Sequence, residues 1–577
     1  AKQYDASVHR ADKSRFLRNM HKPDLLDYIL EYWYGSVLSG VSTHMVNILS
    51  SAVVAGLRTP EYLAASGIGK IRQTLGKQTN AERIKLGEVQ ARIYGDLMGA
   101  VAGWRAMGRT LKHYEKILDS TDEAALRAMR NEAKTTYERL EIDRQIDLIT
   151  DPNTKLELKR QKVIPGIFGV AARLPGRALR AEDLFFKSIA YNQELFGQAY
   201  RLAAKEGKEP KSIKEMATRQ GRMWDIINDN DIAKNFSDIH LKGLDTAQYN
   251  TFTKELGKYG KAINNAANQH RALRFILPFV RTPLNIVKFA HHRTPLALAF
   301  GKKVKQQIAK GGIEKDLALA RIGVGSSVMA TVGFLASQGL VTGRGPKDPK
   351  LRSTMQQNGW QSYSIRIGDK FYGYNRFEPV GILFGLAADM VDIFSFAHDE
   401  DIPDVDEIFS SVMMSITNNV VNKTFLTGVS DAISAIHDGE RYADKWVQRF
   451  AGSFIPTAAY HVRKGDDPLL REVEDIVGQL RNRTPGLSDT LPAKRDIFGD
   501  VMSYSPGWTP VGDSVMSPIR HTELKHDPVL EELIRLKYTP SIPRRKIKGV
   551  EIDEWQYAEM MDLVKEMGTK EKVYNLM

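Results

Sequence analysis

The sequence predicts a mainly α protein: a multi-helix elongated assembly of kinked apolar helices, with one small β-hairpin insertion at about residues 360–377 and an extended C-terminal arm. Long stretches space their apolar residues with a helical period, and only the insertion alternates as a strand does. Proline and glycine interrupt the apolar stretches repeatedly. At 577 residues, with 42% hydrophobic and 26% charged residues, the chain is large enough for several ordered cores.

We expect four consecutive parts. These are an N-terminal helical domain over 1–150, a polar helical segment over 151–270, an apolar helical core with the hairpin over 271–460, and the C-terminal arm over 461–577. The second part is assigned by its Lys- and Asn-rich stretches, and the last by its prolines, glycines and basic residues. Such an arm would wrap a neighbouring chain or element.

The first apolar stretch predicts two helices that are separated near Gly40. The second should run from Ser42 to about Gly56, with Ser42 or Thr43 as its N-cap. Residues 80–150 are typical of a helical hairpin.

Two Pro-Gly pairs, at Pro165 and Pro175, predict breaks that frame short apolar pieces. In the helix that follows, Asp183 and Lys187 stand four residues apart and should form an ion pair on one face.

Two similar phrases, Arg281-Thr282-Pro283 and Arg293-Thr294-Pro295, each follow an apolar stretch. Each proline should open a helical segment that its threonine caps, because proline lacks the N–H that a first turn does not use.

The run from Ile322 to Val341 contains no charged residue, and Arg321 and Arg344 flank it. A helix of 20 such residues is long enough to cross a hydrocarbon layer of roughly 30 Å. Small residues four apart would let another helix approach closely. The candidate membrane or helix-packing positions are Gly323, Ser326, Ser327, Ala330, Gly333 and Ser337. A buried central helix of a soluble protein has the same pattern, so both interpretations stay open.

After the hairpin, Pro379 should begin an apolar helix that carries Asp389 and Asp392. We expect these two acids to be solvated, because they stand three apart near the exposed end of that helix. A polar lumen or a metal site that they line is the alternative. Another apolar stretch follows at 408–436, and the arm should close with a helix from about Asp553 to Met567.

The charge balance favours a phosphate-bearing partner. Formal net charge is +13, and such an excess favours nucleic acid or anionic lipid, although spread over the whole chain it is mild. The candidate phosphate or DNA contacts are Arg281, Arg293, Lys302, Lys303 and Lys305.

The motifs of several enzyme classes are missing. Without cysteine the chain has no disulfide, thiolate metal site or cysteine nucleophile. No phosphate-cradling loop or Gly-x-Ser-x-Gly elbow occurs, and the adjacent His291 and His292 do not have the spacing of a zinc pair. We therefore expect no enzyme, no metal and no cofactor, with a site assembled by folding from separated acids and histidines as an alternative.

Several phrases, in this order, resemble the helical regions of the large internal virion proteins, or polyvalent proteins, of tailed bacteriophages. They are Leu38-Ser39-Gly40 and Thr43 to Asn47 within Trp33 to Asn47, Arg180 to Lys187, Pro278 to Asn285, Phe377 to Gly381, Phe454-Ile455-Pro456, and Arg483 to Ser488.

The resemblance implies storage inside the capsid near the portal, ejection with the genome, and a DNA-translocation conduit across the host envelope. Implied partners are further copies of the chain, portal or other ejection proteins, phage DNA and the host membrane. The peptidase, transglycosylase, methyltransferase and polymerase modules of such proteins have no motif here. The first residue, Ala1, fits either removal of an initiator Met or a piece of a longer polypeptide.

A static protein lining the portal or tail lumen is the alternative function.

Overall fold

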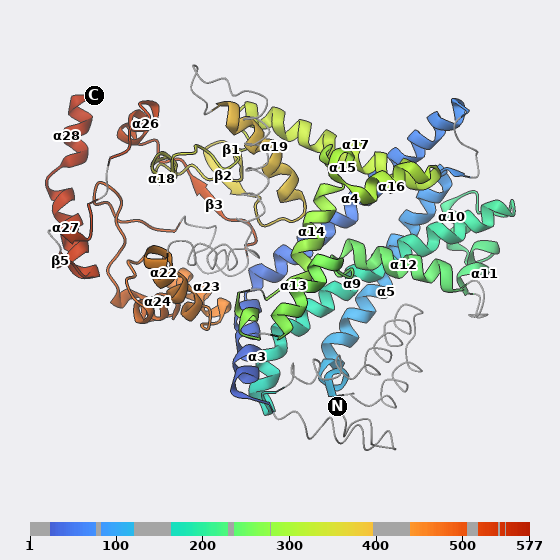
Figure 1. Ribbon diagram of the computed structural model, residues 1–577, viewed down its shortest axis with the longest axis horizontal. Coiled ribbons are helices and arrows are strands. Elements are labelled where there is room, and N and C mark those ends of the chain that lie inside the picture. Colours follow the sequence, from blue (N-terminus) through green and yellow to red (C-terminus); the bar gives the residue numbers. More distant parts are fainter. Residues whose placement is uncertain are drawn as a thin grey trace. The chain divides into compact units, whose positions relative to one another are not determined.

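The computed structural model describes residues 23–76, 82–119, 163–228, 236–269, 271–276, 278–395, 439–504, 517–540, 543–547 and 550–577 (Figure 1). It is mostly helical, with 68% helix and 5% strand, which confirms the predicted fold class. The chain divides into two compact units with interleaved segments. Unit 1 comprises Ala1–Ser39, Ile84–Glu255 and Ala262–Phe275; unit 2 comprises Gly40–Arg83, Leu256–Lys261 and Ile276–Met577.

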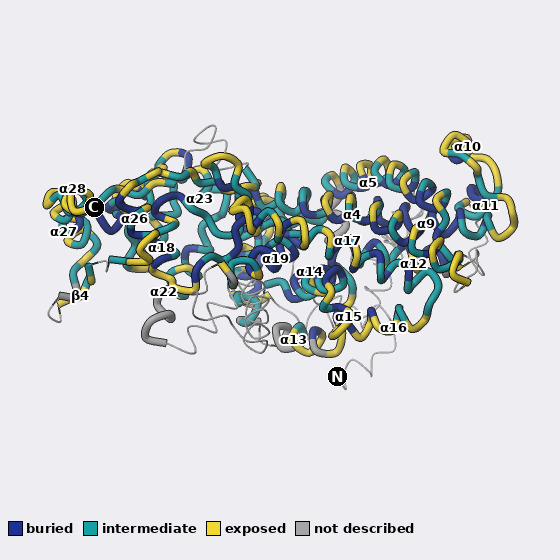
Figure 2. The backbone as a smooth tube through the Cα atoms, turned by 90° about the horizontal axis from the view of Figure 1, so that it is seen from above, coloured by how far each residue is buried: buried dark blue, intermediate teal, exposed yellow. Residues whose placement is uncertain are grey.

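Unit 1 is built around the longest described helix, α9, which packs against α5, α12, α3 and α11. Most residues in the C-terminal half of α9 are buried, as the colour of the tube in Figure 2 indicates. The elements are α3 (Leu25–Leu38), α5 (Leu86–Asp119), α9 (Gly166–Lys205), α10 (Ile213–Ala217), α11 (Arg222–Asn228), α12 (Phe236–Asn250), η2 (Arg271–Phe275) and α13 (Lys258–Gln269), which begins in unit 2.

Three glycines of α5 allow it to approach α9 closely. Gly95, Gly99 and Gly103 stand four apart, and a Cβ on each would lie 2.6 to 2.7 Å from backbone atoms of α9. Such separations are too short for any real side chain. The glycine ridge therefore specifies the close contact of these two helices.

Unit 2 contains α17, which packs against α4, α19 and α16. The helices are α4 (Val41–Thr74), α14 (Arg281–His291), α15 (Leu296–Phe300), α16 (Lys302–Lys310), α17 (Gly312–Ser337), α18 (Pro349–Gln357), α19 (Val380–Ser395), α22 (Gly439–Gly452), α23 (Thr457–Asp466), α24 (Ile476–Arg483), η3 (Ser488–Thr490), α26 (Pro528–Arg535), α27 (Glu554–Glu566) and α28 (Thr569–Leu576).

The predicted β-hairpin is present. Strands β1 (Ser364–Ile367) and β2 (Lys370–Gly373) pair antiparallel, with Ile367 opposite Lys370 across a two-residue turn. Gly368 begins that turn with φ +61°, a conformation that favours glycine. A third strand, β3 (His521–Glu523), pairs with β2, so the C-terminal region completes this sheet. A second small sheet joins β4 (Lys546–Ile547) to β5 (Val550–Glu551).

Two helices continue through prolines where we predicted an end or a break. The break near Gly40 is confirmed, but α4 has Gly40 itself as N-cap and continues past Gly56 and Pro60 to Thr74. In the same way, α9 begins after Pro165 but runs through Pro175. A proline leaves the carbonyl four residues earlier without its N–H partner. Gly56 is exposed, so solvent can satisfy its carbonyl, and the exposed Ala171 plays the same part in α9.

The two Arg-Thr-Pro phrases do mark helix starts, but their threonines do not cap them. Helix α14 begins at Arg281 with Val280 as N-cap, and α15 has Pro295 as N-cap. The Thr294 hydroxyl instead donates to the His291 carbonyl oxygen at 2.9 Å, at the end of α14.

The predicted apolar helix over 322–341 is shifted towards the N-terminus, since α17 ends at Ser337. Gly339 then adopts φ +69°, and the Leu340 N–H donates to the Leu335 carbonyl oxygen at 2.9 Å. This left-handed cap turns the chain out of the helix, and Val341 forms a β-bridge to Ile365.

The C-terminal region is less extended than expected. Ile497, Phe498, Val529, Leu530 and Leu533 form a small core of their own. The predicted closing helix is confirmed as α27, capped by Asp553, and α28 follows it. The predicted apolar stretch at 408–436 lies outside the described residues.

Candidate functional site

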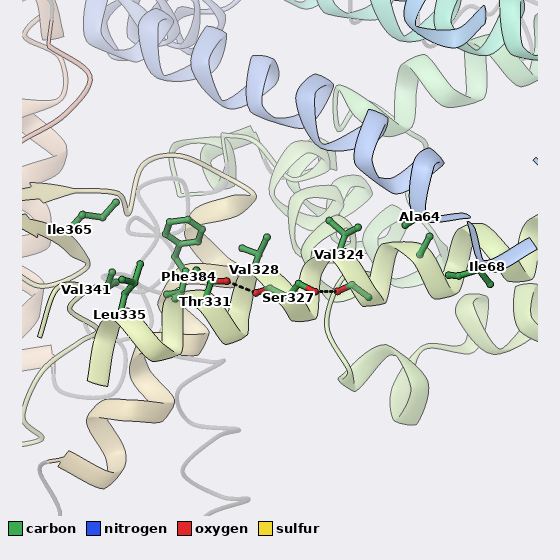
Figure 3. A pocket seen from close by; sticks show the side chains of 13 residues that line it. Ala64, Ile68, Val324, Ser327, Val328, Thr331, Leu335, Val341, Ile365 and Phe384 are labelled. Atoms are coloured by element: carbon green, nitrogen blue, oxygen red, sulfur yellow. Dashed lines mark hydrogen bonds between the residues drawn. The ribbon is translucent and has the colours of Figure 1, made fainter. Parts of the chain in front are cut away.

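An apolar groove of about 640 Å³ runs along α17 in unit 2 (Figure 3). It is lined by Ala64 and Ile68 of α4, by Gly323, Ser327 and Thr331 of α17, and by Phe384 of α19, among others. The hydroxyl groups that line the groove already donate hydrogen bonds within α17. Ser327 donates to the Gly323 carbonyl and Thr331 to the Ser327 carbonyl, both at 2.9 Å. The groove therefore presents methyl, methylene and aromatic groups to whatever enters it.

The small residues of α17 lie mostly on its exposed side. Four of the six candidate positions are exposed and two are half-buried: Gly323, Ser327, Ala330 and Ser337 in the first group, Ser326 and Gly333 in the second. No described atom outside the helix lies within 4 Å of a Cβ built on Gly323 or Gly333. The described residues thus leave this face without a packed helix.

The close contact of α17 is made by a glycine that we did not single out. Gly325 is buried, and a Cβ there would lie 2.0 Å from the Arg293 carbonyl oxygen. Gly325 lies between the candidates Gly323 and Ser327, so the spacing of small residues alone does not identify the residue that makes the close contact. Apart from Gln338, every residue of the run from Ile322 to Val341 is small or apolar, so the pattern does not indicate which face of the helix is covered.

Buried charges fix α17 and α14 to α4. The Arg293 guanidinium donates to both oxygens of Glu61, at 2.7 and 3.0 Å, and each side chain is 2% exposed. It also donates to the Phe289 carbonyl oxygen at 3.0 Å. Arg321 approaches Glu61 at 3.5 Å, and Arg72 of α4 pairs with the fully buried Asp316 at 2.5 Å.

This geometry removes Arg293 from the candidate phosphate contacts. Its guanidinium is enclosed and bidentately paired, so it does not suit an external phosphate. The other four candidates, Arg281 on α14 and Lys302, Lys303 and Lys305 on α16, are exposed.

Positive charge is concentrated around these helices. Residues 256–313 contain 11 Lys and Arg and no Asp or Glu, a formal charge of +11, while the whole chain with 82 Lys and Arg and 69 Asp and Glu has +13. Burial lowers the pKa of His292 to about 3, and Arg321 and Lys303 add to the shift. The excess that looked diluted over 577 residues therefore comes largely from one acid-free segment, a signal that a windowed charge count would have found.

The two acids of α19 are not solvated, contrary to our expectation. Asp389 is 4% exposed and accepts from the backbone N–H of Arg344 at 2.7 Å; Asp392 accepts from the N–H of Gly345 at 2.8 Å. The Tyr363 hydroxyl also donates to Asp389 at 3.4 Å. Burial raises the pKa of Asp392 to about 7. After α17 the chain turns back and brings the N–H groups of Arg344 and Gly345 to α19. The two carboxylates hold this loop by accepting those hydrogen bonds.

Within the described ranges, no group of three or more His, Asp or Glu side chains has an arrangement that could hold a metal ion. The described carboxylates discussed above are engaged with arginines or with backbone N–H groups.

Helix α17 is long and apolar enough to cross a membrane. Its most apolar 18-residue window has a mean hydropathy of 1.5, and only 28% of that window is buried. A central helix of a soluble protein passes the same test of composition, but it is mostly buried.

No protein-family model, curated protein or solved structure matches the chain significantly.

Proposed function

We propose that the chain is an internal virion protein of a tailed phage, ejected with the genome, which helps form a DNA-translocation conduit across the host envelope. The observation that carries this proposal is α17, an apolar helix of membrane-spanning length whose small-residue face is exposed. The order of sequence phrases described above supports the phage origin.

An exposed face of this kind suits a protein with two environments. In water, small and hydroxyl-bearing residues limit the apolar area that α17 presents, and the hydroxyls of Ser327 and Thr331 are satisfied within the helix. In a bilayer, the same residues allow a second helix to approach closely, and backbone groups need no other partner. Copies of the chain are the proposed source of that second helix.

The proposal requires α17 to enter lipid, and the absence of cysteine makes this directly testable. A single cysteine introduced as A330C would carry an environment-sensitive fluorophore on the exposed face. With vesicles of phosphatidylethanolamine and phosphatidylglycerol, we expect a blue shift and protection from aqueous quenchers. A matched label at N575C, exposed on α28, should remain accessible. Equal accessibility of both labels with and without vesicles would contradict membrane entry.

A static protein of the portal or tail lumen is favoured by one different observation. The buried pair of Arg72 with Asp316 holds α17 against α4, and the pair of Arg293 with Glu61 holds the chain after α14 against α4. Separating either pair would leave buried charges unpaired. In this alternative, the groove is covered by a neighbouring virion subunit, and the chain stays in the particle after genome release.

A further inference from the structure

The consecutive helices α15 and α16 carry exposed apolar side chains and exposed lysines within a few residues of one another. Leu298 is 45% exposed and Phe300 is 61% exposed. After the single residue Gly301, α16 presents Lys302, Lys303 and Lys305 to solvent. We call these five residues the α15–α16 surface.

Both helices of the α15–α16 surface pack onto α17. Ala297 and Val304 are buried and pack with Ala318 and Ile322 of α17. Leu298 and Phe300 are not members of that cluster, and their exposure shows that they contribute little to this packing.

We propose that the α15–α16 surface is an anchor for anionic phospholipid bilayers, with Leu298 and Phe300 inserted at the acyl boundary and the three lysines at the headgroup phosphates. Charge complementarity selects this partner. The surface belongs to the acid-free segment 256–313, so no acidic residue within that segment opposes a negatively charged membrane. An apolar side chain next to lysines is the arrangement of interfacial membrane helices.

Nucleic acid would use the lysines but would leave Leu298 and Phe300 unexplained. Phosphate contacts to DNA are made by charged and polar groups, and an exposed phenylalanine beside them gains little from a duplex backbone. The pairing of both residue types on one short segment therefore favours lipid. This inference rests on the proposed function, because ejection into the host envelope is what would bring the chain to a membrane.

The test is partition of the full chain into vesicles of phosphatidylcholine alone or with phosphatidylglycerol, followed by co-sedimentation. Each lysine near an anionic surface contributes about fivefold to partition. The variant K302Q/K303Q/K305Q should therefore lower binding to anionic vesicles on the order of 100-fold and leave the weak binding to neutral vesicles unchanged. F300S should lower binding to both kinds of vesicle.

The matched control is K347Q/K350Q/K525Q, which removes the same charge at exposed lysines elsewhere in unit 2. We expect it to bind anionic vesicles nearly as well as the unmodified chain. An equal loss in both triple variants would overturn the proposal, because net charge alone would then account for binding. So would a K302Q/K303Q/K305Q variant that loses duplex DNA but keeps vesicles.

Failure of the anchor is distinguishable from failure of the proposed function. If the chain leaves the particle with DNA while the triple variant binds vesicles normally, the anchor is wrong and ejection stands. If the anchor is confirmed but the chain remains in emptied particles, the ejection role is wrong.

Discussion

Gly323 and Gly325 lie two residues apart in α17, and their substitution by alanine should have opposite effects on stability. A Cβ at Gly325 would lie 2.0 Å from the Arg293 carbonyl oxygen, whereas a Cβ at Gly323 meets no described atom within 4 Å. Replacing a helical glycine by alanine stabilises the helix by about 1 kcal/mol at either position. That contribution cancels when the two variants are compared.

The difference between G325A and G323A therefore measures packing. Overpacking a filled contact destabilises a protein by roughly 1–3 kcal/mol, and here the obstacle is backbone, which cannot rotate away as a flexible side chain can. Displacing Arg293 would in addition disturb its pair with Glu61. We expect G323A to be slightly more stable than the unmodified chain, and G325A to be less stable than G323A by at least about 1–3 kcal/mol.

Hydrogen exchange of α17 peptides, read by mass spectrometry, would report the change locally, and urea unfolding followed by circular dichroism would report it globally. Faster exchange of α17 in G325A alone is the predicted pattern. Equal stabilities of G323A and G325A, or a loss confined to G323A, would refute the packing described here.

Three further predictions concern the buried groups. E61Q should destabilise unit 2 by about 3–5 kcal/mol, because it leaves the buried Arg293 charge uncompensated. E61L/R293M should recover much of this loss in urea unfolding, and an E61Q variant as stable as E61L/R293M would contradict the prediction. The pKa of Asp392 is about 7 in the folded chain, above its ordinary value of 3.8, because the carboxyl is buried. The folded state therefore holds an extra proton, and stability should fall as pH rises from about 4 to about 7. D392N should abolish that fall and exceed the unmodified chain in urea midpoint at pH 8, and an unchanged pH profile would exclude this role. In unit 1, G99V should separate α5 from α9 and lower the thermal unfolding temperature, whereas G108A, at an open position, should not; equal effects would argue against the glycine ridge.

Features of local sequence were predictable. The alternation of side chains around Gly368 predicts the hairpin, and the spacing of Asp183 and Lys187 in one helix predicts their ion pair, which measures 2.6 Å. The separation near Gly40 was also located. These features depend on residues that are close together in the sequence, so they can be predicted without knowledge of the fold.

What escaped prediction depends on partners that are distant in sequence. Pro60 does not end α4, because the consequence of a missing hydrogen bond depends on whether the carbonyl of Gly56 reaches solvent. The burial of Arg293 depends on Glu61, 232 residues away, and the burial of Asp389 on a loop 45 residues away. A basic residue that contacts phosphate and one that neutralises a buried carboxylate look the same until the fold brings their neighbours together.

Ejection with the genome is the central claim, and quantitative mass spectrometry of purified particles before and after triggered genome release tests it most directly. Under the proposed function the chain is encoded by a phage, so full and emptied particles of that phage would be compared, with capsid protein as the internal standard. We predict that peptides of this chain disappear from emptied particles along with the DNA. Full retention of the chain in emptied particles would contradict ejection, make it a fixed component of the virion, and leave the exposed face of α17 as a contact with a neighbouring subunit.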